Sequence, residues 1–178
     1  TQELINVPLF IRLPGGRQTA RQVALPFSHV DLLPTILDMA GLGCPSAFVG
    51  QSRWPALKNG QPWHDPAITE MVFGHDLSPK GRFTSPGFRL LAATDERYKL
   101  VINFAKGSEE LFDLDRDPQE QRGLSPSANP AAAHRLLSAL QSHLDRSLHN
   151  RHSRPELRMR LGKIQRLIPE PTSLEKMP

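Results

Sequence analysis

Cys44 is the first candidate for chemistry in this chain, because a cysteine thiolate can attack an electrophilic centre. It lies in the run Gly43–Cys44–Pro45–Ser46–Ala47, where no neighbouring charge would favour the thiolate. We therefore interpret Cys44 as a small loop or core residue. As the single cysteine, it provides neither an intrachain disulfide nor a zinc cluster.

A second candidate is the alternating set Asp113, Asp115 and Asp117, since calcium prefers carboxylate oxygens as ligands. A calcium loop of this kind also requires a glycine and a glutamate further along the chain. Neither completes the pattern here. We therefore do not expect these aspartates to be metal ligands.

A third candidate is the basic segment 146–166, in which Glu156 is the one acidic residue. Such a segment could bind nucleic acid or another anionic partner, although a solvated helix face explains most charge runs of this kind. Its basic residues are Arg146, Arg151, Arg154, Arg158, Arg160, Lys163 and Arg166. No aromatic residue interleaves with these charges, so we do not expect nucleic acid to be the partner.

The elements that must position these residues begin with a strand and a helix. Residues 4–13 are an apolar run that predicts a buried strand, which Pro8 places at or near a sheet edge. Residues 28–40 predict a helix that Asp31 caps and Gly41 ends. The face of this helix expected to pack on a sheet consists of Leu33, Ile36, Leu37 and Ala40.

The middle of the chain predicts an antiparallel sheet with one side buried, because apolar and polar residues alternate there. Tyr98 is expected to point inward and the charges of Arg97 and Lys99 outward. Residues 41–66 and 75–87 are expected to be loops. The four predicted strands are 67–74, 88–94, 96–104 and 110–114.

Two helices are predicted after the sheet. Asn129 caps a helix over 131–148, and a basic amphipathic helix follows over 154–168. Residues from Pro169 onward are expected to be a tail. The buried stripe of the first helix is predicted to be Leu136, Leu137, Leu140, Leu144 and Leu148.

The composition limits the class of protein. A chain of 178 residues with net charge +4 and seventeen prolines can form one domain, or one domain with an appendage, and contains much loop. It has no run of about 18 apolar residues, so we expect no membrane span. Residues 1–4 resemble neither a signal peptide nor a translation start, so we expect a fragment of a longer protein. The sequence predicts no compartment.

Four stretches, in this order, resemble the C-terminal portion of a sulfatase of the alkaline phosphatase-like superfamily. They are Val7–Arg12, His29–Leu37, Arg97–Asn103 and Glu110–Pro118. The resemblance extends from Val7 to Leu148 and implies an α/β fold class, α+β within this fragment.

The resemblance also implies a division of the chain. Residues 1–66 would be the end of the large α/β sulfatase-type domain, with its late strand and helix and a loop. Residues 67–150 would be a small four-stranded antiparallel sheet packed with a C-terminal helix. Residues 151–178 would be a basic helical extension and tail. In this arrangement the alternating aspartates would be turn and cap residues.

Sulfatases hydrolyse sulfate esters or sulfamates with a formylglycine made from a Cys/Ser-x-Pro-x-Arg motif, and with a divalent cation, usually calcium. Cys44 does not match that motif, because its proline comes one place too early and no arginine follows. The resemblance therefore implies that the nucleophile and the metal belong to an N-terminal catalytic part of the same protein. We expect this chain to be inactive alone and to contribute packing and substrate selection.

Within the resemblance, His75 is the main candidate for a contact with substrate, with Asp76, Lys80 and Arg82 as further candidates. Relatives often carry a histidine or acidic pair at this point of the pocket mouth. Cationic and hydrogen-bonding groups suit a sulfated small molecule or sugar, which presents hydroxyls and anions. The surrounding sequence is similar to the sulfamidase-like branch, whose members act on N-sulfated glucosamine.

Two other functions stay open on the sequence alone. A phosphonate or phosphate ester hydrolase of the same superfamily would act on an anion of the same tetrahedral shape. A non-catalytic module could instead use residues 146–166 to bind an anionic partner.

Overall fold

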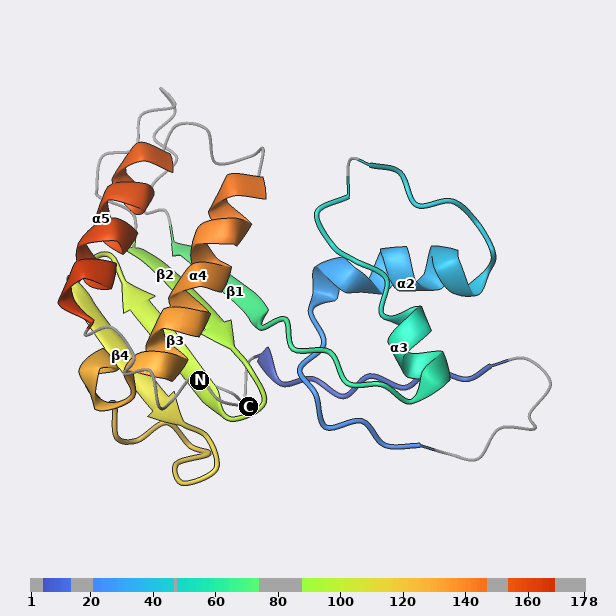
Figure 1. Cartoon of the computed structure of the whole chain (residues 1–178), viewed down its shortest axis with the longest axis horizontal. Helices are drawn as coiled ribbons and strands as arrows, with labels where there is room; N and C mark the ends of the chain where they lie inside the picture. Colours follow the sequence, from blue (N-terminus) through green and yellow to red (C-terminus); the bar gives the residue numbers. More distant parts are fainter. Residues whose placement is uncertain (1–4, 14–20, 47, 74–87, 147–153, 169–178) are drawn as a thin grey trace.

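The computed structural model describes residues 5–13, 21–46, 48–73, 88–146 and 154–168. Two groups of elements lie beside each other (Figure 1). One contains the short helix η1 (His29–Asp31), α2 (Leu32–Met39) and α3 (Trp54–Asn59). The other contains a sheet of β1 (Ala67–Phe73), β2 (Phe88–Thr94), β3 (Tyr98–Asn103) and β4 (Ser108–Asp113), followed by η2 (Pro126–Ala128), α4 (Pro130–Arg146) and α5 (Arg154–Leu167).

The sheet is an antiparallel meander in the order β1-β2-β3-β4, as the alternating sequence predicted. The turn between β2 and β3 forms because the Asp95 carboxylate accepts hydrogen bonds from the backbone N–H groups of Arg97 and Tyr98, at 2.9 and 2.7 Å. At the opposite end, Gly107 adopts φ +69 in the turn between β3 and β4, a conformation that favours glycine.

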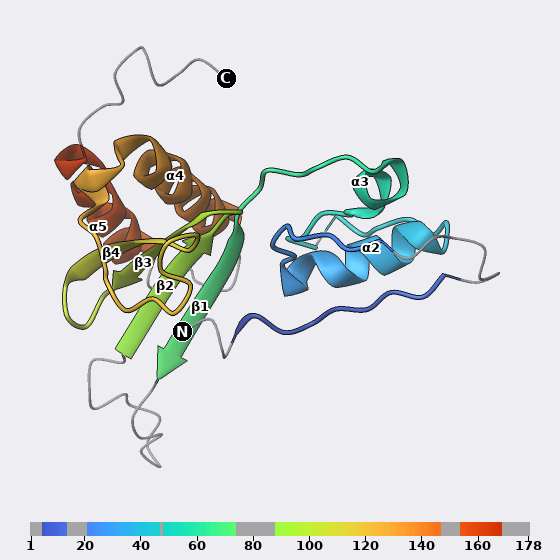
Figure 2. The same ribbon diagram turned by 90° about the horizontal axis from the view of Figure 1, so that it is seen from below.

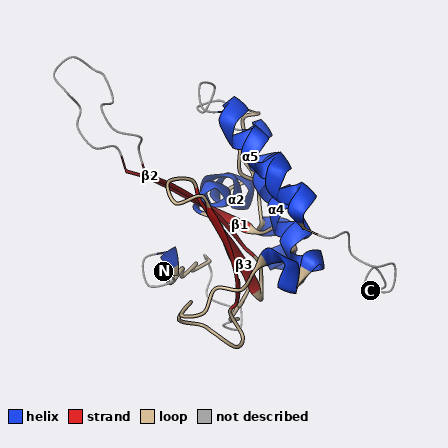
Figure 3. Cartoon of the chain, turned by 90° about the vertical axis from the view of Figure 1, so that its left-hand side faces the viewer, coloured by secondary structure: helices blue, strands red, loops and turns tan. Residues whose placement is uncertain are grey.

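Helices α4 and α5 cover the same face of this sheet (Figures 2 and 3). The predicted cap is confirmed, since the Ala132 N–H donates to Asn129 Oδ1 at 3.1 Å. The core between helices and sheet consists mainly of Leu91, Leu100, Ile102, Leu111, Leu136, Leu137, Leu140, Leu144 and Leu161, each fully or almost fully buried. Each such side chain stabilises the fold by about 1.5–3 kcal/mol relative to exposure. Leu148, predicted in the same stripe, lies outside the described residues.

The strand predicted at residues 4–13 is not formed. The described residues 6–13 belong to no helix or strand and run as an extended trace (Figure 2), no described strand pairs with them, and the Phe10 side chain is 90% exposed. A strand requires a neighbour that satisfies its backbone groups. The buried strand that the apolar pattern predicted is therefore not found among the described residues.

The predicted helix over 28–40 forms as η1 and α2, but the expected side-chain cap is wrong. Asp31 makes no capping hydrogen bond with its side chain. Its carboxylate accepts instead from the Gln51 N–H, 20 residues ahead, and from Arg53 Nε, 22 residues ahead. Leu33 and Ile36 are 47% and 48% exposed, so no described strand covers the apolar face of this helix. The sequence also missed α3, which carries a proline in its first turn and ends at Gly60 with φ +71. No described helix is both long and apolar enough to cross a membrane.

Candidate functional site

The predicted substrate residues His75, Asp76, Lys80 and Arg82 lie outside the described residues. The structure fixes the two strand ends from which their segment departs, because Phe73 of β1 pairs with Phe88 of β2. These ends lie at the same end of the sheet as the turn between β3 and β4, where Asn103 Oδ1 accepts from the N–H groups of Ala105 and Lys106 at 3.1 and 3.0 Å.

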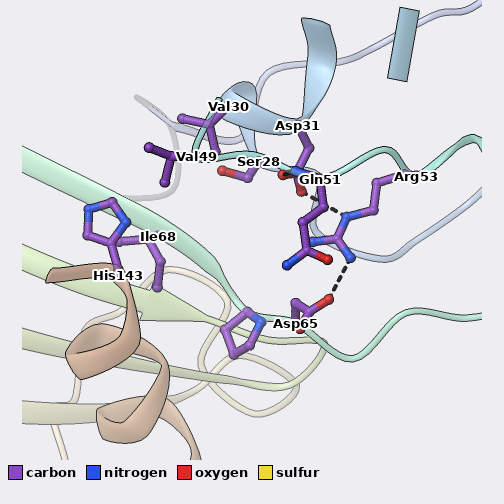
Figure 4. A pocket seen from close by; sticks show the side chains of 10 residues that line it. Ser28, Val30, Asp31, Val49, Gln51, Arg53, Asp65, Ile68 and His143 are labelled. Atoms are coloured by element: carbon purple, nitrogen blue, oxygen red, sulfur yellow. Dashed lines mark hydrogen bonds and ion pairs between the residues drawn. The ribbon is translucent and has the colours of Figure 1, made fainter. Parts of the chain in front are cut away.

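A charged cluster that the sequence did not predict lies at the junction between α2, α3 and the sheet (Figure 4). Arg53 Nε donates to Asp31 Oδ2 at 2.8 Å, and Arg53 Nη1 donates to Asp65 Oδ2 at 2.6 Å. Arg53 and Asp31 are buried, whereas the Asp65 side chain is 59% exposed. Asp31 also accepts from the Gln51 N–H at 2.8 Å. The cluster thus ties the start of α2 to the segment that leads into β1.

Electrostatics keep this arginine charged. Burial alone would lower the pKa of Arg53, but its hydrogen bonds to Asp65 and Asp31 outweigh that effect and raise the pKa above its ordinary value. A permanently charged guanidinium beside two carboxylates is a structural arrangement rather than an acid–base pair.

A small cavity of about 60 Å³ adjoins the cluster and is lined by residues that include Ser28, Gln51, Arg53, Ile68 and His143. Figure 4 shows His143 reaching the cavity from α4. The volume is far below the roughly 300 Å³ or more of a typical ligand pocket. The cavity therefore suits a few water molecules rather than a sulfated sugar.

Two further ion pairs stabilise the sheet. Lys99, predicted to point outward, is buried instead, and its Nζ donates to Glu120 at 2.8 and 2.9 Å. Arg97 donates to both carboxylate oxygens of Asp113, at 2.8 and 3.2 Å. The hydrogen bond from Arg97 lowers the pKa of Asp113 below its ordinary value of 3.8.

The alternating aspartates do not converge on a metal site. Asp113 faces Arg97, while Asp117 accepts from the backbone N–H groups of Gln121 and Arg122 at 3.0 and 2.8 Å. Among the described residues no group of three or more His, Cys, Asp or Glu side chains could hold a metal ion. The donor set in this part of the chain therefore does not fit the calcium that the resemblance implies.

Cys44 is exposed, and its thiol lies near the carbonyl of Pro45 rather than near a cationic side chain. Loop placement of Cys44 agrees with the sequence interpretation. The Arg53 cluster and the Lys99–Glu120 pair escaped that interpretation because their members are 12 to 22 residues apart, and no local spacing rule joins charges at such separations.

Comparison with known proteins identifies the family. The family model for the N-sulphoglucosamine sulphohydrolase C-terminal region matches residues 1–150. The chain is 32% identical over 166 residues to the multifunctional alkaline phosphatase superfamily protein PehA of Trinickia caryophylli, covering 86% of this chain and 32% of that protein. It is 30% identical over 152 residues to the Delta 4,5-hexuronate-2-O-sulfatase of Bacteroides thetaiotaomicron, covering 82% of this chain and 30% of that protein.

A solved structure of a 2-O GAG sulfatase is 27% identical, covers 69% of this chain and 26% of that chain, and superimposes with a TM-score of 0.51. The chain thus spans about a third or less of the length of these relatives. The match covers η1 through α4, including the predicted sheet and its capped helix. The chain belongs to the N-sulphoglucosamine sulphohydrolase C-terminal family, a sulfatase domain family of the alkaline phosphatase superfamily.

Proposed function

We propose that this chain acts as the C-terminal part of a larger hydrolase that cleaves sulfate esters or sulfamates, and that an N-terminal catalytic part of the same protein packs against it. In this proposal the chain contributes packing and substrate selection. The nucleophilic formylglycine and the calcium ion would belong to the N-terminal part.

The observation that carries the proposal is an exposed apolar surface over residues 7–48. Among the described residues, nine of the twelve large apolar side chains that are exposed lie in this range. They are Val7, Leu9, Phe10, Ile11, Val30, Leu33, Ile36, Leu42 and Phe48. Such a concentration of exposed apolar side chains in one part of the chain favours an interface there.

The shape of that surface fits a larger α/β domain. Residues 6–13 are extended and unpaired by any described strand, so their backbone groups can join a sheet. The exposed side chains of Leu33 and Ile36 on α2 can cover such a sheet. The relatives are about three times longer than this chain, which leaves room for that domain.

The substrate would be a sulfated sugar. The family model is that of an N-sulphoglucosamine sulphohydrolase, and two relatives are a hexuronate-2-O-sulfatase and a 2-O GAG sulfatase. The segment between β1 and β2, with His75, Asp76, Lys80 and Arg82, would select the organic part of the substrate. Their cationic and hydrogen-bonding groups support this role.

Packing can be tested with Phe10→Ser and Ile36→Ser. In the 178-residue chain alone both should leave the free energy of unfolding almost unchanged, because the side chains are already exposed. In the longer protein each of these two substitutions should lower the free energy of unfolding by about 1.5–3 kcal/mol. Leu167→Ser is the control, since Leu167 lies outside residues 7–48 and is 78% exposed. Equal stability of all three variants in both contexts would contradict the packing proposal.

Substrate selection can be tested with His75→Ala in the longer protein. We expect kcat/KM to fall for a 2-O- or N-sulfated disaccharide and to stay the same for a small aryl sulfate, which lacks the sugar. Lys58→Ala, an exposed change on α3, is the control. If the ratio of kcat/KM for the disaccharide to kcat/KM for the aryl sulfate is unchanged, His75 does not contact the substrate.

A further inference from the structure

Helix α5 lies beyond the matched family region, but it packs into the core of this molecule. The family match ends at residue 150, and α5 begins at Arg154. Leu161 and Ile164 of α5, and Ile168 directly after it, are buried in the core. Gln141 of α4 donates its side-chain amide to Gln165 Oε1 at 3.0 Å. The helix is therefore held in a fixed orientation on α4.

The side of α5 that faces solvent combines cations with apolar side chains. Met159, Lys163, Arg166 and Leu167 are exposed, with exposed fractions of 61% for Met159 and 78% for Leu167. Their spacing of four, three and one residues places them on one stripe of a helix, opposite the buried stripe. From Met159 to Leu167 this stripe is about 12 Å long.

The sequence around this stripe carries a large excess of positive charge. Residues 157–168 contain no aspartate or glutamate, and the wider segment 146–166 has seven basic residues against Glu156. Such a local excess attracts a polyanion and concentrates it near the surface. Arg166 also has its Nε bound to the Gly162 carbonyl at 3.2 Å, which limits the positions that its guanidinium can adopt.

The position of α5 places this stripe on the outside of the molecule. In Figures 2 and 3, α5 lies with α4 on one face of the sheet, so the side of α5 that is turned away from the core belongs to the outer surface of this helical layer.

From these features we infer that the exposed stripe of α5 binds a sulfated polysaccharide chain outside the reacting sugar. The inference rests on the proposed function. Sulfate groups pair with Lys163 and Arg166 through charge-assisted hydrogen bonds. The C–H faces of the sugar rings pack on Met159 and Leu167. The parent enzyme would then bind polymeric substrates more tightly than isolated sulfated sugars.

The test uses the purified 178-residue chain and a fluorescently labelled heparin hexasaccharide in about 50 mM NaCl, where screening is modest. Fluorescence anisotropy should show saturable binding that weakens as NaCl is added. The double substitution Lys163→Gln/Arg166→Gln should raise Kd by about tenfold or more, because it removes two of the positive charges that attract the polyanion. Circular dichroism verifies that the variant is folded.

A matched double substitution, Lys58→Gln/Arg122→Gln, removes the same charge at exposed sites on α3 and in the segment after β4, and should change Kd by less than about twofold. Absence of binding in low salt, or equal weakening in both double variants, would overturn the inference. Tighter binding to a DNA duplex or to phosphatidylserine vesicles than to heparin would also overturn it. Since the chain alone is measured, failure here leaves the proposed hydrolase function to its own tests.

Discussion

Lys99 and Glu120 form an ion pair at 2.8 Å although both side chains are almost completely buried, with 4% and 7% of their surfaces exposed. Lys99 belongs to β3, and Glu120 lies in the turn that follows β4. Glu120 adopts φ +55, a left-handed conformation that is uncommon for a residue with a side chain. The pair therefore holds a strained turn against the sheet.

Substituting one partner of this pair should destabilise the fold strongly. Lys99→Met leaves the Glu120 carboxylate buried without its cation, which should cost about 3–5 kcal/mol in the free energy of unfolding. The double substitution Lys99→Met/Glu120→Gln removes both charges and should recover much of that loss. Urea denaturation of the three proteins measures the difference. A double variant as unstable as the single one would show that charge burial is not the cause.

The Arg53 cluster predicts unequal effects of its two carboxylates. Asp31→Asn should destabilise the chain by about 3–5 kcal/mol, because the Asp31 side chain is 4% exposed and its loss leaves Arg53 without its buried partner. Asp65→Asn should cost about 1 kcal/mol or less, since the Asp65 side chain is largely exposed. Thermal unfolding of both variants tests this order. Equal shifts in Tm would contradict the difference in burial.

The Arg97–Asp113 pair predicts a pH dependence of stability. Because the folded-state pKa of Asp113 lies below its ordinary value of 3.8, the pair contributes stability that is fully present above pH 3.8. That contribution is lost as the pH falls through the lower folded-state pKa. Compared with Asp113→Asn, the unsubstituted chain should be more stable at pH 7, and the difference should shrink below pH 3.8. Urea midpoints measured across this range give the comparison, and a constant difference would oppose it.

Thr94 offers a prediction of the opposite sign. Its Oγ1 is the one buried side-chain oxygen or nitrogen that lacks a hydrogen-bond partner within the described ranges. Thr94→Val keeps the shape of the side chain and removes the unsatisfied hydroxyl, so it should leave stability unchanged or raise it by about 1 kcal/mol. Thr94→Ser keeps the hydroxyl, deletes a methyl group and should destabilise. A destabilising Thr94→Val would indicate that the hydroxyl is satisfied in solution.

The sheet and α4 could be predicted from sequence because their signals are local. Alternation between neighbouring residues identifies Leu100 and Ile102 as buried in β3, and Asn129 before Pro130 marks the start of α4. The four strands and the capped helix agree with the structure for this reason.

The remainder depended on contacts between distant residues. Asp31 has the residue type and position of a helix cap, yet Gln51 and Arg53 occupy its carboxylate oxygens instead. From the sequence alone, Lys99 has the character of an exposed strand residue. It is buried because its ammonium group pairs with Glu120, 21 residues further along the chain. The apolar residues around Phe10 predicted burial, although the Phe10 side chain is 90% exposed in the structure. The predicted substrate residues from His75 to Arg82 lie outside the described ranges and stay a prediction.

Gly50 shows how closely the loop before α3 approaches η1, and it gives the sharpest substitution test. A Cβ at Gly50 would lie 1.9 Å from the carbonyl oxygen of Val30, a backbone atom that cannot move without shifting η1. Gly50→Ala should therefore destabilise the chain by about 1–3 kcal/mol or more, because this clash displaces the backbone on which the Asp31–Arg53 pair depends. Gly43→Ala is the matched control, since a Cβ there would meet no atom within 4 Å. Tm should fall clearly for the first variant and little for the second, whereas equal Tm values would show that the loop relaxes away from η1.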